Sequence, residues 1–189
     1  MLKFIRRILR VLLAMQRRAL MVVVMLLLVV VFTKPDAERY GDHLQYALPT
    51  LAWACEVADG RGKEYFARFL VMEAVLHGSK QGLGDAPINI RPNGGDEGFP
   101  SGHTTAAVFG ASALVQNCLE NRPVAQMLVI TAAGYVGASR IEAGKHNIWQ
   151  VLAGVFLGWF CERFLRDESP MRRRVLRAMR RLNPFARRR

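Results

Sequence analysis

Six apolar stretches, separated by short polar segments, run along the chain. They are Ala19–Phe32, Leu44–Ala58, Tyr65–His77, Thr104–Leu119, Ala125–Ala138 and Val151–Phe164. The first carries no charge between Arg18 and Lys34, which is typical of a membrane span on the short side. In lipid, every backbone polar group must be satisfied within the chain, and helices do this. We therefore expect an all-α integral membrane bundle of about six transmembrane helices.

The second and third stretches are the weakest of the six, because charged residues lie in or beside them. These residues are Asp42, Glu56, Arg68 and Glu73. Charges within a membrane are costly, and they usually face the interior of a bundle or reach toward an interface. We expect the same of these four side chains.

The overall charge also favours a membrane protein. The chain is 51% hydrophobic yet has a net charge of +12, and basic residues are concentrated in residues 1–18 and 169–189. We interpret these ends as amphipathic segments that bind anionic membrane lipids, flanking a catalytic domain at residues 19–168. Nucleic-acid binding is the less favoured alternative, because no recognition fold accompanies the charge.

The distribution of Lys and Arg between the loops predicts the orientation. If both termini are cytoplasmic, inner segments hold twenty of the 27 basic residues and outer loops hold six. This agrees with the positive-inside rule. We expect a bacterial inner-membrane protein whose loops after the third and fifth stretches are extracytoplasmic.

Three cysteines, Cys55, Cys118 and Cys161, lie inside apolar stretches without metal-binding spacing. We expect buried thiols that behave as small hydrophobic residues, in preference to a disulfide or a metal site.

The segment Pro100-Ser101-Gly102-His103 precedes the fourth apolar stretch and predicts a helix start, with Ser101 as the cap. The unpaired N–H groups of a first helical turn attract anions. Gly102 allows an anion to approach the backbone, and His103 lies within reach of the same ligand. Taken alone, the segment would equally fit an ordinary helix cap.

Two further clusters carry the charges that a phosphate needs. Arg140 and His146 lie in the segment between the fifth and sixth stretches. Lys80 and Arg91 lie at the two ends of a loop that is rich in Gly and Pro. Arginine binds two phosphate oxygens at once, lysine supplies a point charge, and neutral imidazole is a competent nucleophile. Each cluster alone would be an ordinary surface loop. Together they predict a site for one tetrahedral oxyanion.

In combination these residues resemble the type 2 phosphatidic acid phosphatase (PAP2) family, which shares its core with the vanadium haloperoxidases. The family pattern is K-x6-RP, then PSGH, then SR-x5-H-x3-D. PSGH is intact at Pro100–His103, and SR-x5-H is intact at Ser139–His146. The resemblance covers roughly residues 42–158 and implies a PAP2-like bundle that needs no metal or other cofactor.

The resemblance implies a membrane phosphatase that hydrolyses a lipid phosphate or diphosphate through a phosphohistidine intermediate. His146 would attack phosphorus, and His103 would protonate the leaving group. The residues implied to hold the phosphate oxygens are Lys80, Arg91, Ser101, Gly102 and Arg140. The identity of the lipid is left open.

Two departures from the family pattern bear on activity. Ten residues, not six, separate Lys80 from Arg91, and Gln150 replaces the catalytic aspartate four residues after His146. Gln150 shares a helix face with His146 and offers it a hydrogen-bond acceptor, but it supplies no negative charge to a cationic imidazole. The alternatives are a lipid-to-lipid phosphotransferase and a non-catalytic protein that binds a lipid phosphate.

Overall fold

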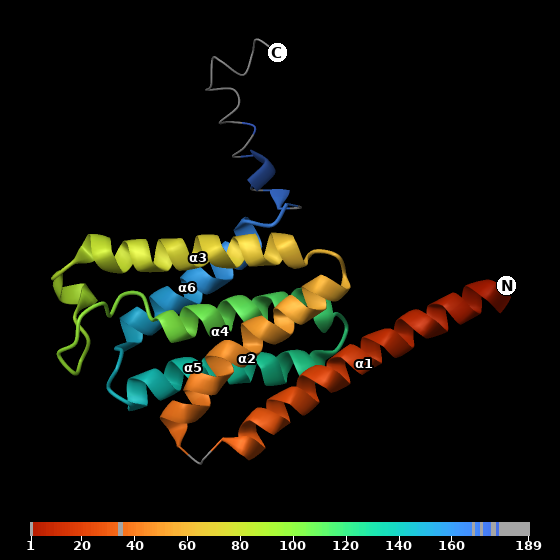
Figure 1. Ribbon diagram of the computed structural model, residues 1–189, viewed down its shortest axis with the longest axis horizontal. Helices are drawn as coiled ribbons and strands as arrows, with labels where there is room; N and C mark the ends of the chain where they lie inside the picture. The colour runs from red at the N-terminus through yellow and green to blue at the C-terminus, as the bar shows by residue number, and fades with distance from the viewer. Residues whose placement is uncertain (1, 34–35, 168, 171, 175–176, 178–189) are drawn as a thin grey trace, which may run out of the picture.

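The structure is a computed structural model, and it describes residues 2–33, 36–167, 169–170, 172–174 and 177, with side chains from Arg17 onward. All regular structure in these residues is helical, which confirms the predicted all-α class (Figure 1). The elements are α1 (Leu2–Phe32), α2 (Ala37–Ala58), α3 (Gly62–Leu83), the 3-10 turn η1 (Pro87–Asn89), α4 (Gly102–Ala113), the π-helical turn η2 (Leu114–Cys118), α5 (Pro123–Glu142) and α6 (Ile148–Phe164).

Helix α4 is the central element, and it packs against α2, α5 and α6 (Figure 1). Glycines permit the closest of these approaches. A Cβ atom on Gly110 of α4 would lie 2.3 Å from the backbone nitrogen of Pro49 on α2. A Cβ atom on Gly158 of α6 would lie 2.4 Å from the carbonyl oxygen of Thr105 on α4. Backbones this close hold the first turn of α4 in a fixed position among its neighbours.

The surface of the bundle is unusually apolar. Large hydrophobic side chains are exposed on α1, α3, α5 and α6, among them Val31, Leu70, Met127, Phe156 and Trp159. Apolar surface on this scale is rare on a soluble monomer and typical of contact with lipid or another protein.

The prediction of six spans is not confirmed. Among the described residues, α5 alone is both long and apolar enough to cross a membrane. Helix α4 has 12 residues and α6 has 17, whereas a span needs about 20. Helices α2 and α3 contain charged residues within their apolar stretches, so neither is apolar enough to count as a span. The side chains of α1 are described only from Arg17.

A buried ionic cluster joins the ends of three helices. Arg68 on α3 donates to a carboxylate oxygen of Glu162 on α6 at 3.0 Å, and a Glu56 oxygen on α2 lies 3.9 Å from the Arg68 guanidinium. Ser112 on α4 donates to the second Glu162 oxygen at 2.9 Å. All three charged side chains are buried. Glu56 and Arg68 therefore face the interior of the bundle, as expected from the cost of exposing them to lipid.

The expectation of free thiols was wrong for two cysteines. Cys55 on α2 and Cys118 on η2 form a disulfide with a Cα–Cα distance of 6.1 Å. The pairing links residues 63 positions apart, so it depends on how η2 packs against α2. Cys161 is free and buried, as expected.

The two predicted basic segments lie largely outside the described residues. The backbone of residues 2–18 is helical and continues into the rest of α1 without a break. Side chains of residues 1–16, and most of the tail at 169–189, are not described. The proposed lipid contacts of both ends remain predictions.

Replacing Arg68 with leucine should destabilise the bundle, because buried Glu162 would lose one of its two arginine partners and keep only Arg166. Glu56 would lose its more distant partner at 3.9 Å and keep Arg61 at 2.8 Å. Loss of a hydrogen bond between charged groups costs about 1.5–3 kcal/mol. Unfolding by denaturant in detergent micelles measures the loss. Lys63→Leu, at an exposed position of the same helix, should change the free energy of unfolding by less than about 0.5 kcal/mol. A loss in Arg68→Leu no larger than in Lys63→Leu would contradict a stabilising role for the cluster.

Candidate active site

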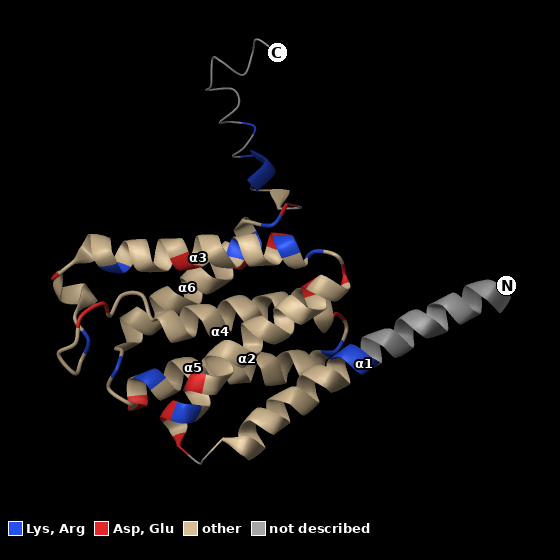
Figure 2. Ribbon diagram, in the orientation of Figure 1, with Lys and Arg blue, Asp and Glu red and all other residues tan. Residues whose placement is uncertain are grey.

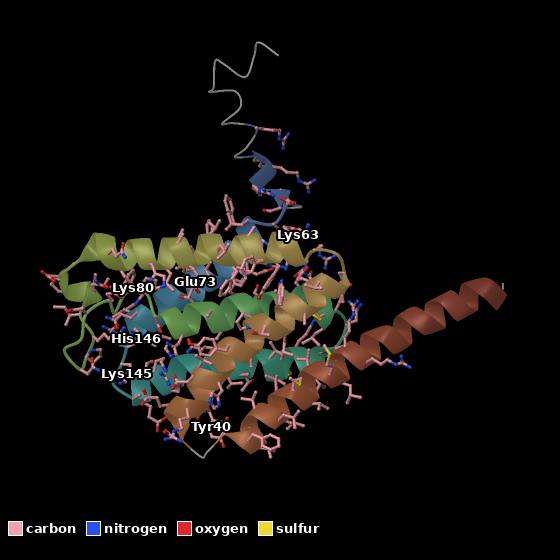
Figure 3. All side chains as sticks on the ribbon, viewed as in Figure 1. Tyr40, Lys63, Glu73, Lys80, Lys145 and His146 are labelled. Atoms are coloured by element: carbon pink, nitrogen blue, oxygen red, sulfur yellow. A yellow bond between two sulfur atoms is a disulfide. The ribbon has the colours of Figure 1, made fainter. Side chains whose placement is uncertain are left out.

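The three sequence clusters meet at one end of the bundle, where α3 and α5 end and α4 and α6 begin (Figure 1). A cavity of about 690 Å³ lies there. The predicted site residues on its wall are Lys80, Arg91, Gly102, His103, Arg140 and His146. Figure 3 shows Lys80 and His146 at this end and Lys63 at the other. Ser101 and Gln150 are fully buried and lie behind the wall.

The long loop between α3 and α4 brings Lys80 and Arg91 together despite their spacing. The Lys80 ammonium donates to the carbonyl oxygen of Glu97, and Arg91 Nη2 lies 3.5 Å from the same oxygen. Asn89 folds the loop back, because its amide donates to the carbonyls of Lys80 at 3.0 Å and Gly84 at 2.8 Å. The extra residues therefore do not separate the two cations.

Arg91 keeps one unused donor. Its Nε–H is buried and has no hydrogen-bond partner among the described residues. Buried polar groups are nearly always paired, so an unpaired donor beside a cavity favours a ligand that supplies the acceptor.

Arg140 is held in place by α2. Its Nη1 donates to Asp42 Oδ1 at 2.9 Å, and its Nη2 donates to the carbonyl oxygen of Glu38 at 2.6 Å. The side chain is only 3% exposed. Helix α2 comes this near because of Gly41, where a Cβ atom would lie 2.1 Å from Ser139 Oγ.

His103 is the second residue of α4, and it also contacts α2. Its Nε2 lies 3.0 Å from Asp42 Oδ1. The pKa of His103 is lowered, by burial first and then by Arg140, and Asp42 opposes part of this shift. The sequence analysis missed Asp42 and treated it only as a charge beside a span. No motif marks it, because its role depends on the path of α2.

His146 is buried in the α5–α6 connection, and Gln150 fixes its hydrogen bonding. The Gln150 amide nitrogen donates to the carbonyls of Ile88 at 3.0 Å and Ile90 at 2.9 Å. Two carbonyl acceptors define which end of the amide is nitrogen, so its oxygen is the atom 3.2 Å from His146 Nδ1. Nδ1 therefore carries a proton, and Nε2 keeps its lone pair.

The charge state of His146 also suits a nucleophile. Burial lowers the pKa of His146 to about 4. The hydrogen bonds to Gln150 and to the backbone of Gly98 oppose this shift, while the cations Arg91 and Lys80 add to it. At neutral pH the imidazole is uncharged, and only the neutral form has a free lone pair on nitrogen.

Ser101 differs from its predicted role at the helix start. It occupies the position before α4, but its side chain makes no capping hydrogen bond. Its hydroxyl instead accepts from Thr104 Oγ1 at 3.0 Å. The expectation of a side-chain cap was wrong, while contact of Ser101 with phosphate stays a prediction. Gly102 lines the cavity, so the first turn of α4 borders the space between the cations.

The site thus combines four features that suit an anionic ester: two cations that share one acceptor, a buried arginine, a neutral imidazole with a defined tautomer, and a second imidazole beside a carboxylate. Positive charge fixed in a partly buried cavity stabilises phosphate oxygens without reorganisation. Among the described residues, no group of three or more His, Cys, Asp or Glu side chains is placed to hold a metal ion.

Comparison with known proteins agrees with this chemistry. The model of the PAP2 superfamily matches residues 18–173 of the chain. No solved structure matches it. Members of the superfamily are generally phosphatases that act on phosphate esters, and they are often associated with membranes. Because the match spans all three clusters and most of the sequence, the chain belongs to the PAP2 superfamily.

Proposed function

We propose that this protein hydrolyses a lipid phosphate or diphosphate through a phosphohistidine formed on His146. The observation that carries the proposal is the hydrogen bonding of His146. Gln150 accepts from Nδ1 and leaves the Nε2 lone pair free, on the wall of a cavity that also contains Lys80 and Arg91. A neutral, oriented imidazole beside fixed cations is the arrangement that attack on an anionic phosphorus requires.

The reaction runs in two steps. The Nε2 lone pair of His146 forms a bond to phosphorus as the ester P–O bond breaks, and His103 gives its proton to the leaving oxygen. Water then attacks phosphorus and passes a proton to His103, and the P–N bond breaks with its electrons returning to Nε2. Lys80, Arg91 and Arg140 stabilise the equatorial oxygens in both steps.

Aromatic and aliphatic residues support a lipid as the substrate. The cavity continues from the cations along a wall between α2 and α3 that includes Tyr46, Trp53, Phe66, Phe69 and Leu76. Trp53 and Phe66 are about half exposed, at 46% and 52%. An apolar chain attached to the phosphate would lie along this wall and continue into the bilayer.

The same features support a location in a membrane. Apolar side chains are exposed on α1, α3, α5 and α6, while charged residues such as Arg68 and Glu162 are buried. We propose the six-helix topology with cytoplasmic termini, in the bacterial inner membrane, so that the cavity opens on the extracytoplasmic side. Basic residues at both ends would then face anionic lipids.

Catalysis is favoured over passive binding of a lipid phosphate. A binding site needs cations but has no use for a particular imidazole tautomer, and Gln150 supplies that tautomer here. No contact among the described residues favours a phosphotransferase over a hydrolase.

His146→Ala should abolish release of inorganic phosphate from lipid phosphates in detergent, because no other described group occupies the nucleophile's position. His43→Ala is the matched control, since His43 contacts Thr33, directly after α1, and is not on the cavity wall. It should retain wild-type turnover. Labelling with a ³²P-substrate should give an acid-labile adduct in the wild type and in His43→Ala, but not in His146→Ala. Undiminished turnover in His146→Ala would contradict the proposed nucleophile.

The imidazole of His146 should titrate near pH 4, well below an ordinary histidine, because burial disfavours the charged form. Its folded-state pKa is lowered, so the neutral form persists as pH falls until about 4. NMR of protein labelled at its four histidines measures this, with His146→Ala assigning the signal. A midpoint near 6.5 would show that the site is not desolvated.

Gln150→Glu should lower kcat/KM by about tenfold or more, because a carboxylate cannot donate to the carbonyls of Ile88 and Ile90 and repels both oxygens. The negative charge that this variant would place beside His146 does not offset the loss of both hydrogen bonds to the α3–α4 loop. Steady-state kinetics with a lipid phosphate measures the effect. Turnover faster than wild type would show that charge at position 150 matters more than the loop contacts.

A further inference from the structure

We infer that Asp42 is a positioning residue for the general acid: its carboxylate orients His103 and balances the positive charge that the imidazole carries before it protonates the leaving group. The inference rests on the proposed function and adds a residue that lies outside the three sequence motifs.

The geometry places one carboxylate oxygen between the acid and a phosphate-binding arginine. Asp42 Oδ1 lies 3.0 Å from His103 Nε2 and 2.9 Å from Arg140 Nη1. The Asp42 side chain is itself restrained, because Arg140 also donates to the Glu38 carbonyl one turn earlier on α2. A carboxylate fixed in this way holds the imidazole ring in one orientation. With Nε2 engaged by Asp42, Nδ1 is the nitrogen that remains to pass a proton to substrate.

The surrounding charges explain why His103 needs this partner. The charged groups that act on it are Asp42 from α2, Arg140 from α5 and Arg91 from the α3–α4 loop. Further titratable groups on the cavity wall are Glu38, Glu73, His77, Lys80, Glu97, Lys145 and His146. Burial and Arg140 both disfavour the imidazolium, and Asp42 opposes them by raising the pKa of His103. Without Asp42, the charges that act on His103 would be the guanidinium groups of Arg140 and Arg91.

The two histidines have partners that match opposite tasks. The nucleophile His146 must be neutral, and it is paired with the uncharged amide of Gln150. The acid His103 must be protonated, and it is paired with the carboxylate of Asp42. The pKa of both histidines is lowered by burial, but Asp42 opposes the shift at His103, whereas the pKa of His146 falls to about 4. Active sites that need one acid and one base use such differences in environment.

The leaving group tests this role directly. An alkyl phosphate leaves as a strongly basic alkoxide and needs the general acid, whereas p-nitrophenyl phosphate releases a stable phenolate and does not. Asp42→Asn should reduce kcat for decyl phosphate by about 100-fold, the lower range for general-acid catalysis, and kcat for p-nitrophenyl phosphate by less than tenfold. The alkaline limb of the decyl phosphate profile should move to lower pH, since removing Asp42 lowers the pKa of His103.

Two further variants test whether the effect of Asp42 acts through His103. His103→Ala should show the same dependence on the leaving group, and the double variant should lose little more than either single variant. Glu38→Gln is the matched control. It removes a carboxylate of α2 that lies 3.8 Å from Arg140 Nη1, whereas the carboxylate beside His103 is that of Asp42. It should leave the ratio of the two rates at its wild-type value.

Retained turnover of p-nitrophenyl phosphate would show that Asp42→Asn is folded. If Asp42→Asn does not fold, Asp42→Ser allows the same comparison of the two substrates. Equal losses for both substrates in a folded variant would overturn the inference. So would undiminished decyl phosphate turnover with tighter inhibition by inorganic phosphate, which would mean that Asp42 merely occupies the phosphate site. A wild type inactive on both substrates would instead remove the proposed function, and the inference with it.

Discussion

The side-chain amide of Gln150 connects His146 to the α3–α4 loop, and the rest of the site depends on this connection. Its oxygen faces His146 Nδ1, and its nitrogen donates to two carbonyls of the α3–α4 loop. The same oxygen accepts from the backbone of Asn147, so the capping box of α6 is part of the same unit. One residue therefore sets the imidazole tautomer, the start of α6 and the position of the segment that leads to Arg91.

Charge is organised differently at the two ends of the bundle. Figure 2 shows Lys, Arg, Asp and Glu mostly at these ends, with long uncharged stretches between them. At the end opposite the cavity, Arg68, Glu56 and Glu162 are buried and paired. At the cavity, Lys80 and Arg91 share a single carbonyl acceptor and line open space. The first arrangement suits stability, and the second leaves positive charge available to a ligand.

Local patterns in the sequence predicted much of this molecule. Apolar stretches predicted the helices, and short motifs predicted His103, Arg140 and His146, because these depend on residues near one another in the chain. Contacts made by tertiary packing could not be predicted. Asp42 reaches the site because Gly41 lets α2 pass close to α5, and Cys55 meets Cys118 because η2 packs on α2. Spacing was misleading for Lys80, since Asn89 folds the longer loop back.

The amide at position 150 and the carboxylate at position 42 each serve a different histidine. A carboxylate at 150 would strengthen the charge on His146 but would face the carbonyls of Ile88 and Ile90, which need a donor. An amide at this position donates to both loop carbonyls and leaves His146 neutral. It adds no negative charge that could balance the cations around His103. Asp42 supplies it at His103 and at Arg140 together. Gln150 therefore acts on the nucleophile and the α3–α4 loop, whereas Asp42, whose side chain is 40% exposed, acts on the acid and on Arg140.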